Sequence, residues 1–278
     1  MSQPAGNPND VCYRHPDRRS FILCQRCGRT VCPECQVQAA VGVQCPECVR
    51  EAGKAMPKVR RPLRFGRNSG APVTYALIGV NVGVFAIDYL LRSFGISIAQ
   101  LLLFAPARDL YFGFAPWTMV TSAFVHANLL HILFNAYSLF IFGRMVEQAL
   151  GKARFLALYF VSAFGGSTAV LLIGGMNTAV LGASGAVFGL MGAFLVIQRR
   201  LGGNSVQILV VVGINLALGF IIAGVSWQAH VGGVLSGAAV AAVLLATRER
   251  RQRSLQIAGI AGIAAVLIAI GTVRVLLG

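Results

Sequence analysis

Long apolar runs separated by short polar breaks make up most of this chain after residue 71. The runs lie at 72–91, 124–142, 155–198, 201–247 and 257–277, and the two longest hold no Asp, Glu, Lys or Arg over 44 and 47 residues. About 20 apolar residues cross a bilayer as a helix, so each of these two runs predicts two spans. Their breaks fall at 174–178 and 226–228, where polar residues and glycines interrupt the pattern. The whole pattern predicts seven transmembrane helices.

The rest of the chain is more polar and divides the molecule into parts. Residues 92–123 mix polar and aromatic side chains, which suits a segment lying at the bilayer interface. We therefore expect an all-α polytopic membrane protein with a small N-terminal domain. The four expected parts are a metal-binding domain at 1–51, a basic linker at 52–71, a six-helix core at 72–247, and a cytosolic loop with a seventh transmembrane helix at 248–278.

Composition and charge support a membrane location. Of the 278 residues, 56% are hydrophobic and only 12% are charged, which is too apolar for a soluble protein of this length. The net charge of +15 would favour nucleic acid in a soluble protein, but here the basic residues flank the apolar runs. We expect no nucleic-acid partner, and we expect the basic linker to be attracted to anionic lipid.

The distribution of Lys and Arg predicts the orientation in the bilayer. With the N-terminus in the cytosol, only Arg92, Arg108 and Arg274 of the 24 Lys and Arg residues lie outside, as the positive-inside rule requires. The first 70 residues also lack the apolar segment of a secretory signal. We expect an integral multi-pass protein, placed in the plasma membrane, with a cytosolic N-terminus.

Seven cysteines and one histidine near the N-terminus form four ligand pairs. The pairs, each with a two-residue gap, are Cys12/His15, Cys24/Cys27, Cys32/Cys35 and Cys45/Cys48. Such a gap lets both side chains of one turn reach the same metal ion, and eight ligands suffice for two tetrahedral Zn²⁺ sites. Redox or disulfide chemistry is the alternative, but the odd number of cysteines disfavours a purely disulfide framework. Thiolates that hold zinc persist in reducing compartments, in agreement with a cytosolic domain.

The pairing of these ligands is open from spacing alone. Sequential binding would join the first two pairs and then the last two. Cross-braced binding would join Cys12/His15 with Cys32/Cys35, and Cys24/Cys27 with Cys45/Cys48. Because the segment has few large apolar residues, metal must supply much of its folding energy, and only cross-bracing ties both halves into one unit. The order of ligands also resembles a B-box-type zinc finger, which implies a binding or regulatory module with a cytosolic partner that the sequence does not name.

An isolated serine between glycines, in Gly182-Ala183-Ser184-Gly185, is the candidate nucleophile. Small residues often mark only helix contacts in membranes, so this motif alone favours a packing role. The residues that accompany Ser184 in the other predicted spans favour a catalytic role instead. Ser184 and His230 begin the fourth and sixth predicted spans, and each is followed by a small-residue face, Gly185/Gly189 and Gly233/Gly237. Helices packed through these faces would bring the hydroxyl and the imidazole together as a nucleophile and base.

Three further polar residues and one ring complete the candidate site. His131 and Asn135 are four residues apart and share a helix face, so both could donate hydrogen bonds to an oxyanion with the Ser184 backbone N–H. His126 is either an interfacial residue or a supporting one. Phe188 lies one turn after Ser184 and could stack on the His230 ring. No Asp or Glu is expected at this depth, so we predict a dyad, with no cofactor for catalysis.

These residues resemble the signatures of the rhomboid family of intramembrane serine proteases. The matching segments are His126-x₄-His131-x₃-Asn135, Gly182-Ala183-Ser184-Gly185 and Ala229-His230-x₂-Gly233-x₃-Gly237. The resemblance covers about residues 72–247, and Gly143, Glu147 and Gly151 also fit it. Two positions depart from the family pattern: Thr118 follows Trp117 where the family often has Arg, and Phe188 stands where it often has Tyr.

The resemblance implies a six-helix catalytic core, with Ser184 as nucleophile, His230 as general base, and Asn135 with His131 as oxyanion donors. It implies single-span membrane proteins as substrates, cut in or near the outer part of the bilayer. Two other classes remain as alternatives. A catalytically silent relative would bind and sort membrane helices, and a transporter would show mid-membrane ionisable groups and internal repeats.

Overall fold

The computed structural model describes residues 10–39, 41–55, 70–108, 115–203, 205–221 and 224–277. The chain divides into two compact units, Met1–Pro62 and Leu63–Gly278. Most of the basic linker predicted at 52–71 lies outside the described residues, as does part of the aromatic segment predicted to lie at the interface.

The first unit is a small domain with little regular structure. It contains a 3₁₀ turn, Pro33–Cys35, a two-stranded antiparallel sheet of β1 (Val37–Gln38) and β2 (Val43–Gln44), and helix α1 (Pro46–Ala55), which continues past residue 51. Its buried core consists of six cysteines and Val31. A core so small needs additional cross-links to be stable.

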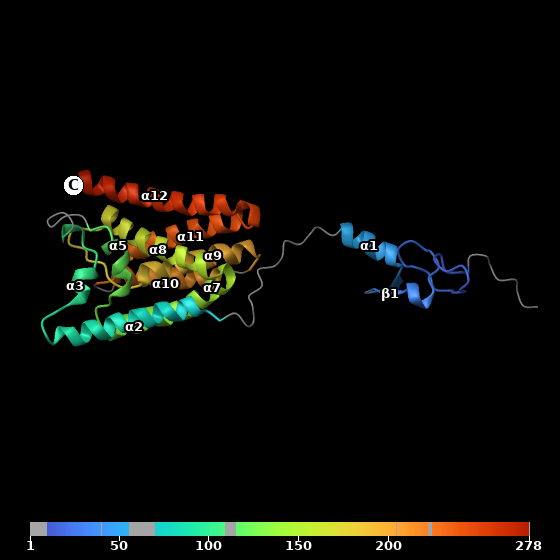
Figure 1. The fold of residues 1–278 in the computed structure, drawn as a ribbon, viewed down its shortest axis with the longest axis horizontal. Helices are drawn as coiled ribbons and strands as arrows, with labels where there is room; N and C mark the ends of the chain where they lie inside the picture. Colours follow the sequence, from blue (N-terminus) through green and yellow to red (C-terminus); the bar gives the residue numbers. More distant parts are fainter. Residues whose placement is uncertain are drawn as a thin grey trace, which may run out of the picture. The chain divides into compact units, whose positions relative to one another are not determined.

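The second unit is a bundle of long helices (Figure 1). In chain order they are α2 (Pro72–Arg92), α6 (Leu129–Ser138), α7 (Arg144–Leu150), α8 (Lys152–Ile173), α9 (Ser184–Arg200), α10 (Val206–Ile221), α11 (Trp227–Ala246) and α12 (Arg253–Leu277). A π-helical turn, Leu139–Gly143, joins α6 to α7 so that they form one span. Two short helices, α3 (Ile98–Leu102) and α5 (Thr118–Thr121), lie in the connection between α2 and α6.

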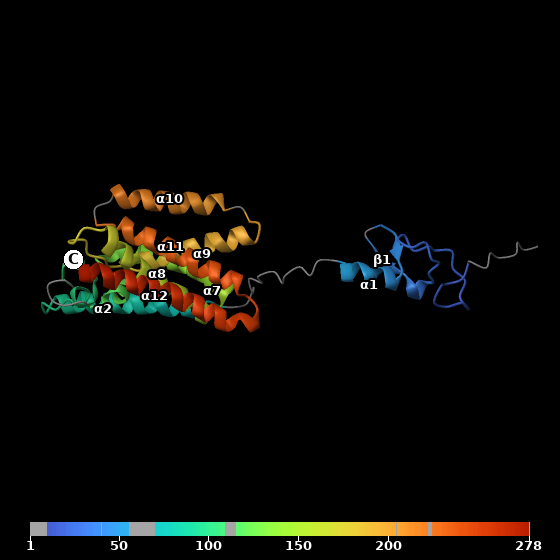
Figure 2. The ribbon, with the colours of Figure 1, turned by 90° about the horizontal axis from the view of Figure 1, so that it is seen from above.

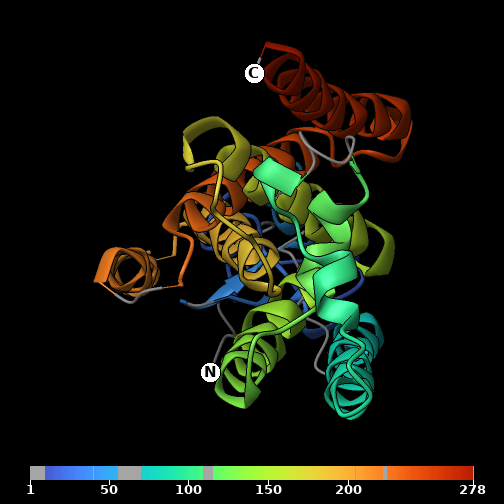
Figure 3. The same ribbon diagram turned by 90° about the vertical axis from the view of Figure 1, so that its left-hand side faces the viewer.

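The predicted all-α polytopic fold is confirmed. Among the described residues, five helices are long and apolar enough to cross a membrane: α2, α6–α7, α8, α11 and α12. The other two predicted spans are present as shorter helices, α9 with 17 residues and α10 with 16. Helix α9 is central, and most of its first eleven residues are buried between α8 and α11. In the end-on view of Figure 3, α2, α10 and α12 lie on the outside of the bundle.

The predicted bounds of two spans were wrong. The second span was expected at 124–142, but Phe124 belongs to a 3₁₀ turn and the helix begins after Asn128, whose side chain accepts a hydrogen bond from the His131 N–H. The helix also continues through Arg144 and Glu147 to Leu150. The sixth span begins at Trp227 instead of His230, because Ser226 caps it by accepting from the Ala229 N–H.

Glu147 explains why the second span continues past its charged residues. Its carboxylate accepts hydrogen bonds from the Val73 N–H at 3.1 Å, the Thr74 N–H at 2.8 Å and the Thr74 hydroxyl at 2.7 Å. The first N–H groups of a helix have no partner within the helix and favour a negative charge. The buried carboxylate of α7 therefore caps the start of α2.

Candidate functional site

A cavity of about 510 Å³ brings the predicted site residues together. It is lined by residues of α6, α9, α10 and α11, among them Ser184, His230, His131 and Asn135. His230 and Asn135 are each 6% exposed, and Ser184 is half-buried at the first position of α9. The helix therefore presents both its free backbone N–H groups and the serine hydroxyl to the cavity.

Glycines allow α9 and α11 to pack backbone to backbone. A Cβ atom added at Gly233 would collide with the carbonyl oxygen of Gly185, and one added at Gly237 would collide with that of Gly189. The two predicted glycine faces therefore do meet, with the helices parallel and in the same register along both contacts. This register sets Ser184 beside the first turn of α11, where His230 lies.

Helix α8 supplies a third small-residue face that the sequence analysis did not identify. A Cβ added at Gly166 would lie 2.9 Å from the Ala229 carbonyl oxygen, and one at Gly165 would lie 2.5 Å from the Ser236 hydroxyl. The signal was present in the sequence as the pair Gly165-Gly166 inside an apolar run. Helix α11 therefore packs closely against α9 on one side and against α8 on the other, which fixes the position of its first turns.

The imidazole of His230 lies flat against the ring of Phe188. The ring centroids are 3.9 Å apart and the planes differ by 12°. Its Nδ1 has no hydrogen-bond partner among the described residues, so aromatic contact and not a carboxylate orients this ring. No hydrogen bond joins Ser184 to His230 in the part of the chain that the structure describes, and catalytic hydrogen bonds often form only once substrate is bound.

His126 supports the segment that precedes Ser184. It is 1% exposed, so it is buried in the protein and is not an interfacial residue. The Ala183 N–H donates to its Nε2 at 3.5 Å, and its ring meets that of His131 edge-on with centroids 5.2 Å apart. The Gly182 N–H also donates to the Ser122 carbonyl at 2.9 Å. These contacts hold both residues before the serine.

Gly182 allows the proposed oxyanion donors to approach the serine. Its φ of +110° is a conformation that favours glycine. A Cβ at this position would lie 2.5 Å from His131 Nε2 and 3.6 Å from Asn135 Nδ2. Asn135 Nδ2 also donates to the His131 carbonyl at 2.9 Å. Both side chains of α6 thus reach the backbone just before Ser184.

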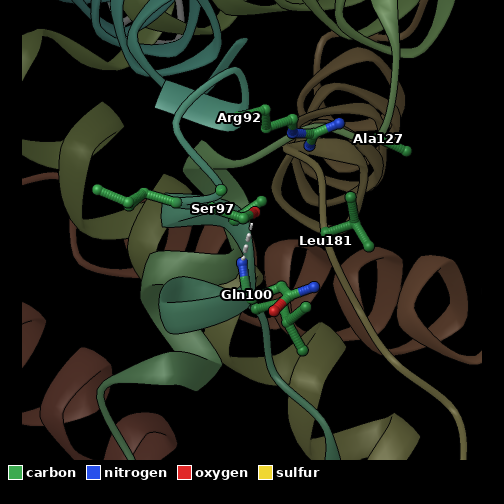
Figure 4. Close-up of a pocket in the computed structure, with 9 residues that line it drawn as sticks. Arg92, Ser97, Gln100, Ala127 and Leu181 are labelled. Carbon is green, nitrogen blue, oxygen red and sulfur yellow. Dashed lines mark hydrogen bonds between the residues drawn. The ribbon is translucent and has the colours of Figure 1, made fainter. Parts of the chain in front are cut away.

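A second cavity of about 430 Å³ adjoins the first, and both are lined by Ala127 and Leu181 (Figure 4). Its other walls come from the end of α2 and from α3, with the Arg92 guanidinium at its edge. Arg92 pairs with the buried Asp88 carboxylate at 2.7 Å. Asp88 in turn accepts from the Ala99 N–H at 2.9 Å, so this ion pair fixes α3 to the end of α2.

The eight predicted metal ligands form two groups of four in the N-terminal unit. Cys12, His15, Cys32 and Cys35 make one group, and Cys24, Cys27, Cys45 and Cys48 make the other, with the ligand atoms of each group within 4.8 Å of one another. This is the grouping that cross-braced binding requires, and it differs from the grouping that sequential binding requires. The seven cysteines are free thiols, not disulfides.

The spacing of the ligand atoms fits tetrahedral zinc. Bonds of about 2.3 Å to sulfur and about 2.05 Å to nitrogen place two sulfurs about 3.8 Å apart and a sulfur and a nitrogen about 3.6 Å apart. The Cys27 and Cys45 sulfurs are 3.8 Å apart. His15 Nδ1 lies 3.8, 3.3 and 3.5 Å from the sulfurs of Cys12, Cys32 and Cys35. Each of the two groups could therefore hold one ion.

The thiol pKa values within each group are shifted in opposite directions. Burial alone would raise the pKa of Cys12 and of Cys24, but hydrogen bonds from backbone groups outweigh it and lower each pKa to about 6. Burial, together with the neighbouring cysteines, raises the pKa of Cys35 to about 11 and of Cys48 to about 12. Within each group one thiol ionises readily and another resists. A divalent cation would remove that resistance.

Comparisons with known proteins assign the chain to a protein family. A family profile described as Rhomboid domain matches residues 113–247. The Putative rhomboid protease YdcA of Bacillus subtilis is 32% identical over 140 residues, which is 49% of this chain and 70% of that protein. The chain therefore belongs to the rhomboid family.

Other relatives match over a similar length of this chain. The Rhomboid protease GluP of Bacillus subtilis is 34% identical over 136 residues, 46% of this chain and 26% of its own. RHOMBOID-like protein 6, mitochondrial, of Arabidopsis thaliana is 35% identical over 136 residues, covering 46% of this chain and 44% of its own. The chain thus spans less than half the length of these two relatives.

Proposed function

We propose that this protein is an intramembrane serine endopeptidase that cleaves single-span membrane proteins in or near the outer part of the bilayer. The observation that carries the proposal is that Ser184, His230, His131 and Asn135 line one cavity. Membership of the rhomboid family and relatives named as proteases support it.

In the proposed reaction, His230 removes the proton of the Ser184 hydroxyl as its oxygen attacks the scissile carbonyl carbon. The carbonyl oxygen becomes an oxyanion, which Asn135, His131 and the Ser184 backbone N–H stabilise with hydrogen bonds. His230 then gives its proton to the leaving amine, and an acyl-enzyme remains on Ser184. Water activated by His230 releases the second fragment and restores the serine.

The bilayer places a condition on the substrate. A regular helix uses its backbone carbonyls in its own hydrogen bonds, so the segment to be cut must unwind. Residues with poor helix propensity near the cut would make this easier. We propose that the active site opens to the outer side, with the N-terminus in the cytosol, because this orientation agrees with the distribution of Lys and Arg.

We also propose that residues 1–51 form a zinc-binding domain with two structural Zn²⁺ ions, followed by a basic linker to residue 71, a catalytic core to residue 247 and a C-terminal transmembrane helix. The domain holds none of the proposed catalytic groups, and its resemblance to a B-box-type zinc finger implies a binding or regulatory role. The cross-braced groups support two ions.

The decisive experiment incubates purified protein with candidate single-span substrates in detergent and in bilayers, with Ser184→Ala alongside. Cleavage by the wild type and none by Ser184→Ala is the expected result. If Ser184→Ala binds a substrate helix that the wild type also binds but does not cut, the protein is instead a silent relative that sorts membrane helices.

A further inference from the structure

Helix α10 carries one polar side chain in the middle of an apolar sequence. Of its 16 residues, only Gln207 in the first turn and Asn215 have polar side chains. Gln207 is exposed and does not line the cavity, whereas Asn215 lines it together with Leu218. A polar side chain in the middle of a membrane helix is costly and therefore points to a use.

The carboxamide of Asn215 has hydrogen-bonding capacity to spare. Its Nδ2 donates to the Val211 carbonyl of its own helix at 2.8 Å. Within the described part of the chain this is its only hydrogen bond, so its second amide hydrogen and its Oδ1 are available to a ligand. One donor and one acceptor side by side are also what a peptide group presents.

Part of the wall of the cavity that Asn215 lines is apolar. Phe134 of α6 and Val187 and Met191 of α9 also line this cavity and are apolar. A substrate that unwinds here loses the hydrogen bonds of its own helix, and these apolar side chains cannot replace them. Each backbone group left without a partner in such surroundings is strongly destabilising.

Helix α10 is also placed to meet an incoming helix. It lies at the outside of the bundle in Figures 2 and 3. Its far end is held by Phe220, which stacks on Trp227 with centroids 4.6 Å apart. Asn215 lies more than one turn before that contact, on the part of the helix that borders the cavity.

We propose that Asn215 is a binding site for the peptide backbone of the unwound substrate segment. Its carboxamide accepts from a substrate N–H and donates to a substrate carbonyl, which lowers the cost of opening the substrate helix. This inference rests on the proposed function and adds a determinant of substrate choice. A substrate with Pro at the contacted position has no backbone N–H to donate to Asn215 Oδ1, so it depends on Asn215 less than a substrate with Ala or Leu there.

The test compares two substrates that differ only near the cut, one with Gly-Pro and one with Ala-Leu. The ratio of their kcat/KM values is measured for the wild type, Asn215→Leu and the control Gln207→Leu. Loss of one paired backbone group predicts that Asn215→Leu widens the ratio about tenfold. Gln207→Leu removes a polar side chain from the same helix outside the cavity, and it should leave the ratio unchanged.

An unchanged ratio in Asn215→Leu, or an equal widening in Gln207→Leu, would overturn the proposal. The proposed function is tested separately, because the wild type must first cleave the Gly-Pro substrate and Ser184→Ala must not. If that result is obtained and the ratio does not change in Asn215→Leu, only the inference about Asn215 fails. A second measurement needs no turnover. In the Ser184→Ala background, adding Asn215→Leu should weaken binding of the Ala-Leu substrate more than that of the Gly-Pro substrate. Equal weakening of both would contradict the inference.

Discussion

Phe188 lies one turn after Ser184 on α9 and stacks on the imidazole of His230 from α11 at 3.9 Å. A ring contact of this kind contributes about 0.5–1.5 kcal/mol, enough to orient a base that has no carboxylate partner among the described residues. The contact therefore links the two helices at the point where the proposed chemistry takes place.

Replacing this ring should impair catalysis more than folding. We expect Phe188→Leu to lower kcat about tenfold, because the imidazole loses its flat support. Phe188→Tyr keeps the ring and should stay within about threefold of the wild type. Phe194→Leu is the control, since Phe194 is buried on the same helix against Phe142 and does not line the cavity. An equal loss of kcat in Phe194→Leu would mean that the effect is one of packing.

Ser184 and His230 should act as one unit. Ser184→Ala and His230→Ala are each expected to abolish cleavage, and the double variant should be no worse, because residues of one catalytic unit have non-additive effects. Single-turnover assays would measure the residual rates, and thermal unfolding would show that the variants are folded. A folded single variant that still cuts at the wild-type rate would remove that residue from the mechanism.

Asn135→Ala should lower kcat by about 10²–10³-fold if the amide is a principal oxyanion donor. His131 can share this role, and the loss would then be smaller. Asn81→Ala is a suitable control, because Asn81 is a buried asparagine of α2 that does not line the cavity. It should change stability and leave kcat close to that of the wild type. A wild-type kcat in Asn135→Ala, both in detergent and in bilayers, would exclude the amide.

The contact between α9 and α11 should tolerate no side chain. A Cβ at Gly233 meets the Gly185 carbonyl, so Gly233→Leu should separate the helices and displace His230 from Ser184. A shift of about 1 Å in a catalytic pair can reduce the rate about 10²-fold. Gly262→Leu on α12 is the matched control, because nothing lies within 4 Å of a Cβ there. Unchanged turnover in Gly233→Leu would show that this spacing is not needed.

The N-terminal domain should bind two Zn²⁺ per chain, measurable by elemental analysis of the purified protein. Cys45→Ser should loosen the ion held with Cys24 and Cys27 and leave the ion held with Cys32 and Cys35 in place. Cadmium-substituted NMR of the full chain would identify which cysteines share an ion. A shared ion between Cys32 and Cys45 would contradict the pairing in the structure.

The features that could be predicted from the sequence are those that depend on local patterns of residues. Apolar runs gave the helices, and Ser184 does begin α9. The spacing of Gly185/Gly189 and Gly233/Gly237 predicted the contact between α9 and α11, because small residues four apart lie on one helix face whatever surrounds them. The two-residue gaps between cysteines likewise predicted the ligand pairs.

What the sequence did not predict depends on partners far away along the chain. The second span was expected to end at residue 142, but the helix continues past Arg144, and Glu147 is buried and bonded to the start of α2. The support of Ala183 by His126 spans 57 residues, and no local pattern encodes it. Two cap residues, Asn128 and Ser226, were visible as good N-cap types and could have corrected both helix starts.

The cap on α2 also bears on the order in which the protein is made. The first N–H groups of α2 find their partner in Glu147, which is synthesised more than seventy residues later. Until α7 has emerged and inserted, the start of α2 has only water or lipid headgroups for these bonds. During biosynthesis the start of α2 therefore lacks these hydrogen bonds until α7 is in place, and Glu147 then fixes the end of α2 that adjoins the linker.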